Sequence, residues 1–263
     1  MHLLKFSKYQ GAGNDFIIID NRDSQFPKLS TEEIEKLCNR RFGIGADGFM
    51  LLQNSMDSDF EMVYYNADGN IGSMCGNGGR CIVAFAKKIG VIKNSTNFLA
   101  VDGMHSATIN DSADWVSLKM QDVDRIDQDE DAYVLNTGSP HYVKVVSDLK
   151  NMNVALEGAS IRNNDTYHQE GINVNFANPE NKGYFVRTFE RGVEDETLAC
   201  GTGVTAVALA MAKHHQQMGD IETPIRVLGG DLSIRFHAEN GKFTNIFLEG
   251  PAKFVFEGTI EIS

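Results

Sequence analysis

Basic side chains are scarce in this chain. Its 263 residues include 24 Lys and Arg against 36 Asp and Glu, which gives a net charge of −12 at pH 7. Nucleic acids and anionic membranes bind basic patches on proteins. We therefore expect neither as a partner, and we interpret the acidic balance as an ordinary solvated surface.

Long hydrophobic runs are absent as well. The first ten residues hold too few apolar side chains for a secretory signal. No segment of the sequence approaches the ~20 apolar residues that a membrane helix needs. Hydrophobic residues still make up 42% of the chain, which is enough for one large core or two ordinary ones. The sequence thus predicts a globular protein, and we expect it in the cytoplasm.

Cysteine is rare, with four residues in the whole chain. They do not suggest a disulfide framework, and none lies in a Cys-x-x-Cys pair with the spacing of zinc ligands, so we expect reduced thiols. Cys38 falls on the apolar face of a helix introduced by a capping box at residues 30–33, and we expect it in the core. We expect the same of Cys81. This leaves Cys75 and Cys200.

The surroundings of these two cysteines are nearly the same. Residues 74–80 read MCGNGGR and residues 199–205 read ACGTGVT, and Ala-rich apolar runs of helical character follow at 81–88 and 206–213. The first N–H groups of a helix lack intrahelical partners, and the peptide dipoles add there. Such an end binds carboxylates and lowers the pKa of a thiol. The pattern favours two reactive thiols, each beside an anion site.

The spacing of these stretches indicates a duplication. Cys200 lies 125 residues after Cys75, and the same spacing pairs Gly13 with Gly138 and Lys88 with Lys213. A repeat this long is too large for a solenoid, so we interpret it as a duplicated domain with pseudo-two-fold symmetry. Residues 122–131 are charged and poor in apolar side chains, and we interpret them as the link. We predict one domain from residues 1–119 plus 253–263 and a second from residues 120–252.

Two thiols facing each other across a cleft suit one kind of reaction. Inversion of a stereocentre by proton transfer needs a base on one face of the carbon and an acid on the other. A thiol with a pKa near the working pH can serve as either. The helix ends would hold the adjacent carboxylate and stabilise negative charge that develops at the carbon. No cofactor is required for this chemistry.

With these residues assembled, the sequence resembles the diaminopimelate epimerase family, whose members convert LL-2,6-diaminopimelate to the meso form without a cofactor. The matching stretches occur in both halves and lie at residues 11–16, 41–48, 66–69, 74–81, 138–141, 171–176, 190–192 and 200–203. The resemblance implies an α+β fold of two homologous domains, each a mixed or antiparallel, barrel-like sheet wrapped around a central helix. It also implies a role in lysine and peptidoglycan precursor biosynthesis, a small amino-acid substrate and a homodimeric assembly.

The resemblance further implies site residues. Cys75 and Cys200 are the expected acid/base thiols, His141 is expected near them to set their protonation, and Glu190 is expected to bind the distal ammonium or to tune Cys200. The substrate-binding residues that it implies, from the carboxylate at the reacting centre to the distal end, are Gly76, Asn77, Gly201, Thr202, Asn14, Asn66, Asn173, Glu190 and Arg191. No metal ligand is expected.

Two positions depart from the family pattern. Ser139 stands where many members carry Asn, so we expect a shorter or water-mediated contact there. Gly48 stands where some members carry Gln, and we do not count it in the site. Both departures concern the grip on the substrate and leave the two thiols untouched.

Several alternatives stay open at this point. A proline or hydroxyproline racemase has the same architecture and paired cysteines, but that family typically carries His where this chain has Asn77. A binding module could hold a carboxylate without chemistry, although binding alone has no need for two thiols. The two cysteines could be structural, His141 could be a core histidine, and Glu190 with Arg191 could be a surface pair.

Overall fold

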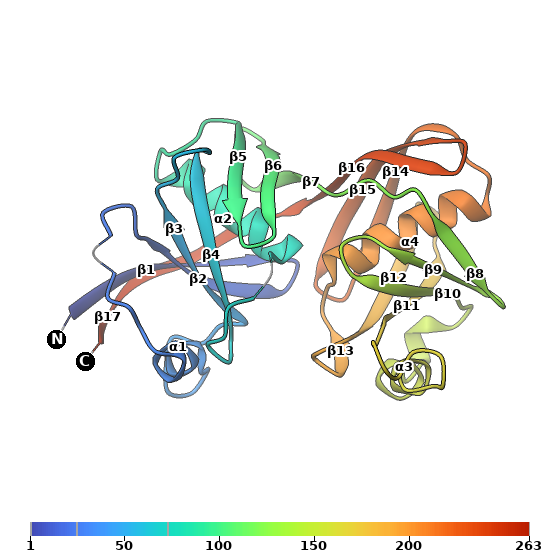
Figure 1. Cartoon of the computed structure of the whole chain (residues 1–263), viewed down its shortest axis with the longest axis horizontal. Coiled ribbons are helices and arrows are strands. Elements are labelled where there is room, and N and C mark those ends of the chain that lie inside the picture. Colours follow the sequence, from blue (N-terminus) through green and yellow to red (C-terminus); the bar gives the residue numbers. More distant parts are fainter. Residues whose placement is uncertain (1, 25, 73, 263) are drawn as a thin grey trace. The chain divides into compact units, whose positions relative to one another are not determined.

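The computed structural model describes residues 2–24, 26–72 and 74–262, and it separates into two compact units (Figure 1). The first unit runs to Leu118 and takes up the chain again from Gly250 onward, whereas the second unit is Lys119–Glu249. The sequence-based division was placed at 119/120 and 252/253.

The first unit is a mixed sheet with two helices. Strand β1 pairs antiparallel with β2 and with the C-terminal strand β17, β2 pairs parallel with β3, and β3 pairs antiparallel with β4. The sheet continues through a parallel β4–β5 pair and the antiparallel pairs β5–β6 and β6–β7. Its elements are β1 (His2–Gly11), β2 (Asn14–Asp20), α1 (Thr31–Cys38), β3 (Gly48–Gln53), β4 (Phe60–Asn66), α2 (Gly76–Lys88), β5 (Ser95–Ala100), β6 (Gly103–Ile109), β7 (Trp115–Lys119) and β17 (Lys253–Ile262).

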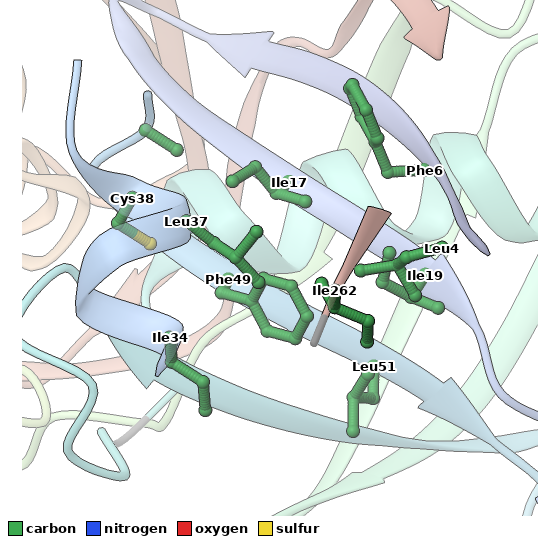
Figure 2. Close-up of a cluster of buried hydrophobic side chains, with 11 residues drawn as sticks. Leu4, Phe6, Ile17, Ile19, Ile34, Leu37, Cys38, Phe49, Leu51 and Ile262 are labelled. Carbon is green, nitrogen blue, oxygen red and sulfur yellow. The ribbon is translucent and has the colours of Figure 1, made fainter. Parts of the chain in front are cut away.

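Both helices of this unit are fixed by burial against the strands of its sheet. Helix α1 begins at the predicted capping box, where Ser30 and Glu33 each bond the other's backbone N–H. Its buried face, Ile34, Leu37 and Cys38, packs with Phe49 and Leu51 of β3 (Figure 2). Helix α2 is buried from its first residue to Ala86, with strands β1, β2, β3, β6 and β17 packed around it. Cys38 and Cys81 lie in the core as predicted.

The second unit repeats this plan with its own core. Helix α3 packs on β11 and β12 around Phe176, Phe185 and Phe189, and helix α4 is buried along most of its length. Its elements are β8 (Ile126–Asp129), β9 (Ala132–Asn136), β10 (Pro140–Val145), η1 (Leu149–Asn151), α3 (Val154–Arg162), β11 (Asn173–Pro179), β12 (Tyr184–Glu190), β13 (Asp195–Thr197), α4 (Gly201–His214), β14 (Gly219–Val227), β15 (Gly230–Glu239) and β16 (Lys242–Pro251).

The order and direction of strand pairing are the same in both units. In the second unit β9–β10 is antiparallel, β10–β11 parallel, β11–β12 antiparallel and β12–β14 parallel, followed by the antiparallel β14–β15 and β15–β16. The parallel pair keeps its register under the 125-residue spacing, since Phe16 lies opposite Gly48 and His141 lies opposite Asn173. The predicted fold class, a mixed sheet around a central helix occurring twice, is therefore confirmed.

Three details differ from the sequence-based expectations. Residues 122–131 are more than a surface link, because Val123 and Ile126 are buried and β8 pairs with β9. Helices α2 and α4 begin at the glycine after each cysteine, earlier than the apolar runs indicated. Helix α3 was not predicted from the sequence. In the described ranges no helix is long and apolar enough to cross a membrane.

Candidate active site

Cys75 is the residue immediately before helix α2, with an extended backbone at φ −96° and ψ 132°. Its carbonyl oxygen accepts the first helical hydrogen bond, from Gly79 N at 2.7 Å, while its side chain does not cap the helix. The thiol is half-buried. At this position the peptide dipoles of the first turn favour both a thiolate and a bound anion.

Asn77 and Asn14 meet beside this helix start. Asn77 is fully buried, and its Nδ2 donates to Asn14 Oδ1 at 2.5 Å. Asn14 in turn donates through Nδ2 to Asp47 Oδ2 at 3.0 Å. Two of the predicted substrate-binding side chains thus belong to one oriented chain of hydrogen bonds that runs from the loop before β3 to the first turn of α2.

An ion-pair cluster anchors the strand that carries Asn14. Arg40 donates to both carboxylate oxygens of Asp15, at 2.7 and 2.9 Å, and to Asp47 at 2.6 Å, and Lys8 lies 2.8 Å from Asp15. Burial acts to raise the pKa of Asp15, but the hydrogen bonds from Arg40 and Lys8 outweigh it and hold the pKa at about 2. Asp15 is therefore ionised at neutral pH and keeps the start of β2 in place.

Arg80 is the buried charge of this helix start. Its side chain is fully buried, and its guanidinium donates to Gly76 O at 3.2 Å, to Asn77 Oδ1 at 2.9 Å and to Pro251 O at 3.4 Å. Burial lowers its pKa, while the nearby thiols of Cys75 and Cys81 act in the opposite direction. The motif at residues 74–80 ends with this arginine, but its role could not be read from the sequence.

Asn66 ends strand β4 at the same edge of the sheet as Asn14. Register places Asn66 opposite Gly48, and Gly48 opposite Phe16, two residues after Asn14. The Asn66 side chain is exposed. Gly48 has a packing reason, because a Cβ there would lie 2.5 Å from the Tyr64 ring. The Tyr64 ring therefore occupies the space that a longer side chain at position 48 would need.

Cys200 holds the equivalent position at helix α4. It precedes Gly201 with φ −118° and ψ 111°, and its carbonyl oxygen accepts from Val204 N at 3.0 Å. Its thiol is buried, and Sγ lies 3.5 Å from Thr202 Oγ1. Thr202 O accepts a hydrogen bond from Thr137 Oγ1 at 2.9 Å, which fixes the first turn of the helix. The predicted group Cys200, Gly201 and Thr202 is therefore assembled.

His141 is fully buried in a polar network close to the start of α4. Asn175 Nδ2 donates to His141 Nδ1 at 3.0 Å, and Asn175 Oδ1 accepts from Thr188 Oγ1 at 3.0 Å. Because an amide nitrogen only donates, His141 carries its proton on Nε2. That Nε2 is buried and has no hydrogen-bond partner among the described residues. Burial lowers the His141 pKa to about 3, assisted by the charge of Arg191, so the ring is neutral at neutral pH.

Asn173 links three of the predicted positions. Its Nδ2 donates to Ser139 Oγ at 2.8 Å and to Pro140 O at 3.0 Å, and its Oδ1 accepts from Arg191 N at 2.9 Å. Ser139 therefore contacts Asn173 directly, and its contact with a substrate stays a prediction. The Arg191 side chain is exposed and donates to Glu170 O at 3.0 Å.

Glu190 ends strand β12 next to Arg191. Burial raises the pKa of its carboxyl. A raised pKa makes the protonated form accessible nearer to neutral pH, which is a common property of groups that exchange protons or wait for a charged ligand. His141, Asn173 and Glu190 thus lie on the neighbouring strands β10, β11 and β12 of the second unit, and Arg191 directly follows β12.

Sequence reasoning gave no role to several residues of these networks, among them Arg80, Asn175 and Thr188. Asn175 could have been found, because in a strand Asn173 and Asn175 point to the same face, and two amides on a buried face need partners. A Cβ at Gly203, in the first turn of α4, would come 2.3 Å from Asn175 Oδ1, so the amide abuts that turn. Across residues 2–24, 26–72 and 74–262, no group of three or more His, Cys, Asp or Glu is arranged to hold a metal ion.

The diaminopimelate epimerase family model matches residues 6–126 and 133–255 of this chain. Diaminopimelate epimerase of Flavobacterium psychrophilum is 56% identical over 258 residues, which cover 98% of this chain and 100% of that relative. The chain belongs to the diaminopimelate epimerase family. The family resemblance of the motifs is thereby confirmed, and the protein is an enzyme of the epimerase type. Diaminopimelate epimerase of Chlorobaculum tepidum is 41% identical over 263 residues, covering 96% of this chain and 99% of that protein.

Solved structures show the same fold outside the epimerase family. A phenazine biosynthesis protein of the PhzF family from Bacillus anthracis has a TM-score of 0.77 at 14% identity, with 100% of both chains covered. A probable proline racemase from Agrobacterium radiobacter, solved with bound carbonate, has a TM-score of 0.71 at 14% identity and covers 99% of this chain and 93% of its own. At such identity the likeness shows the fold alone, so the family match and not the fold separates epimerase from racemase.

Proposed function

We propose that this enzyme interconverts LL- and meso-2,6-diaminopimelate by a two-thiol mechanism without a cofactor. The proposal is supported by the named relatives and by one observation above all. Cys75 and Cys200 each occupy the position directly before a buried helix. The two positions are equivalent in two units that have the same strand order. Two structural cysteines would have no reason to occupy this particular position twice.

The proton chemistry follows from that placement. One cysteine, as thiolate, takes the α-proton and becomes a thiol. The other cysteine, as thiol, gives its proton to the opposite face of the same carbon and becomes a thiolate. The electron pair left by the first step resides on the substrate between the two transfers, and first-turn amides near its carboxylate stabilise it. The mechanism requires that both thiols reach one substrate molecule.

We assign recognition to the side chains around the two helix starts. The turns at Gly76–Asn77 and Gly201–Thr202 would bind the carboxylate at the reacting carbon. Arg191 suits the distal carboxylate, because a guanidinium matches two oxygens. The remaining contacts to the distal amino-acid end are assigned to Asn14, Asn66, Asn173 and Glu190.

His141 acts in this proposal as a neutral donor and not as a proton carrier. Its Nδ1 is held by Asn175, and its buried Nε2–H is available for a substrate oxygen or a thiolate. A neutral ring does not change charge during the reaction. Glu190, with its raised pKa, is the group that would meet the distal ammonium or adjust Cys200. The homodimer and the cytoplasmic location stay predictions from the sequence.

Incorporation of solvent deuterium tests the proposal. The reduced enzyme is incubated in D₂O with LL-diaminopimelate and no added cofactor, and both the α-deuterium content and the meso product are followed by mass spectrometry and chiral chromatography. We expect label at one α-carbon per turnover together with the meso isomer. A parallel incubation with L-proline should stay unlabelled. Label in proline and none in diaminopimelate would establish the racemase alternative, and label in neither would refute both.

A further inference from the structure

Arg80 is an unusual group to bury in the first turns of a helix. A charge removed from water is costly unless other groups compensate it, and a guanidinium stays protonated in proteins. Among the described residues no Asp or Glu pairs with Arg80, and its three acceptors are two carbonyl oxygens and the Asn77 side chain. A buried cation with only neutral acceptors is incomplete until an anion lies nearby.

Two thiols lie close to this guanidinium: Cys81 is the next residue of the helix, and Cys75 directly precedes Gly76, whose carbonyl oxygen accepts from Arg80 at 3.2 Å. Cys81 is fully buried, and burial raises its pKa to about 12, so it remains a neutral thiol at working pH. Cys75 is half-buried and occupies the position directly before helix α2. Of the two, Cys75 is therefore the thiol that can supply a counter-charge to Arg80.

The second unit lacks this charge. The 125-residue spacing places Thr205 at the position of Arg80, and Thr205 Oγ1 donates to Gly201 O at 2.9 Å. Arg80 makes the matching contact with Gly76 O at 3.2 Å. Both side chains thus bond the carbonyl of the first helical residue, and the charge is the added feature at Arg80.

We propose that Arg80 is a positioning residue for the Cys75 thiol: its buried positive charge favours the thiolate of Cys75, and its bonds to Gly76 O and Asn77 Oδ1 fix the carboxylate-binding turn. The inference rests on the proposed function for its purpose, because only a proton-transferring Cys75 needs this help. In this role Arg80 acts through Cys75, Gly76 and Asn77 and does not touch the substrate.

Other ionisable groups on this helix and on the strands packed against it differ in their effect. They include Lys8 and Tyr9 of β1, Asp15 of β2, Cys81, Lys87 and Lys88 of α2, His105 of β6 and Glu257 of β17. Lys87 and Lys88 lie in the last turn of α2, at the opposite end from Cys75, and Lys88 pairs there with Glu257 at 3.4 Å. Tyr9 and Cys81 have raised pKa values and stay neutral, and Asp15 is neutralised by Lys8 and Arg40. Arg80 is therefore the charge whose removal should change Cys75 most.

The pH dependence of alkylation tests this role. Iodoacetamide is reacted with the full-length protein between pH 5 and 10, and the rate at Cys75 is read from the mass of its peptide. Wild type is compared with R80Q, which removes the charge but keeps polar atoms, with R80K, which keeps the charge, and with T205V, the matched change in the second unit. Cys81, buried in the folded protein, should remain unmodified in every folded variant.

We expect R80Q to raise the midpoint of Cys75 alkylation by about one pH unit or more, which is about tenfold less thiolate at pH 7. R80K should restore most of the midpoint, and T205V should leave it unchanged. An unchanged midpoint in folded R80Q overturns the proposal, as does an R80K midpoint shifted as far as that of R80Q. Should R80Q fail to fold, the wild-type chain decides, because Cys75 must then alkylate at lower pH than Cys200, and the reverse order overturns the proposal.

Alkylation uses no diaminopimelate, so the two proposals fail separately. A shifted R80Q midpoint together with no epimerisation would retain the charge effect and remove the proposed function. Epimerisation with an unchanged midpoint would do the opposite.

Discussion

The two cysteine–helix starts share a backbone plan but have opposite surroundings. In the first unit a Cβ at Gly78 would contact the apolar side chains of Met50, Met62 and Phe16, at 3.5–3.6 Å. In the second unit the equivalent glycine, Gly203, abuts the polar side chain of Asn175. At this glycine the first helix thus packs on apolar side chains, and it carries a buried charge, Arg80, whereas the second helix packs there on a polar network and has no charged residue among its buried ones.

This difference separates what both halves need from what each half adds. The thiol before the helix and the glycines of the first turn are common to both. The side chains around them are not, since Phe16 and Met50 of one unit correspond to His141 and Asn175 of the other under the 125-residue spacing. Proton transfer to either face needs a matched pair of thiols. A substrate with two different ends needs unmatched surroundings.

Removal of either thiol should give the largest effect and tests the common part. We expect C75A and C200A each to lower the epimerisation rate at least ~10³-fold, because each removes an acid/base group. C38A, a change in the core of helix α1, should keep activity within about twofold of wild type. Product formation by chiral chromatography measures the rates, with circular dichroism as the check on folding. Wild-type rates in either variant would break the symmetry of the proton chemistry.

Loss of the polar network should come next and tests the difference. N175A leaves Thr188 and His141 without a buried partner, so we expect a loss of about 2–3 kcal/mol in the free energy of unfolding and at least a tenfold loss of activity. The matched change M50L exchanges one apolar side chain for another and should cost less than about 1.5 kcal/mol. Urea denaturation measures both. Equal losses would mean that the two surroundings serve packing alone.

The acid dependence of stability comes last, because it concerns a single proton on one side chain. The pKa of His141 is about 3 in the folded protein, below the ordinary value of 6.5, so the unfolded chain binds the extra proton between these values. Its contribution is complete above pH 6.5 and falls by about 1.4 kcal/mol per pH unit as the pH drops toward 3. Urea titrations measure the free energy of unfolding of wild type and of H141Q. The difference between the two should change with this slope as the pH is lowered from 6.5 to 4.5. A constant difference would contradict the neutral buried ring.

The sequence predicted the parts of this molecule that depend on local patterns. The capping box at Ser30 and the core placement of Cys38 and Cys81 follow from helix periodicity and are confirmed. The strand β8 was missed, because Ile126 is its one buried residue and the three residues that follow are polar or charged. Helix α3 was missed because two of its nine residues, Val154 and Gly158, are buried, too few to give a clear apolar stripe.

The sequence predicted the candidate site only where the type of a residue, such as cysteine, itself indicates a chemical role. Cysteine next to Gly-x-Gly is informative in any context, and family resemblance added the asparagines. The partners that orient these residues depend on pairing between distant segments. Asn175 acquires its meaning from the parallel register of β10 and β11, and Arg80 from the segment at Pro251 that covers it. Neither contact can be inferred from spacing along the chain.

The shared register of the two parallel strand pairs has a consequence for how such an enzyme can change. The pair Phe16 and Gly48 occupies the same framework position in the first unit as the pair His141 and Asn173 in the second. The two units can therefore be compared position by position. Mutations that alter ligand preference can accumulate in one copy while the geometry of the reaction is retained by both. Phe16 and His141 show that this shared framework position accepts an apolar side chain in one half and a polar side chain in the other.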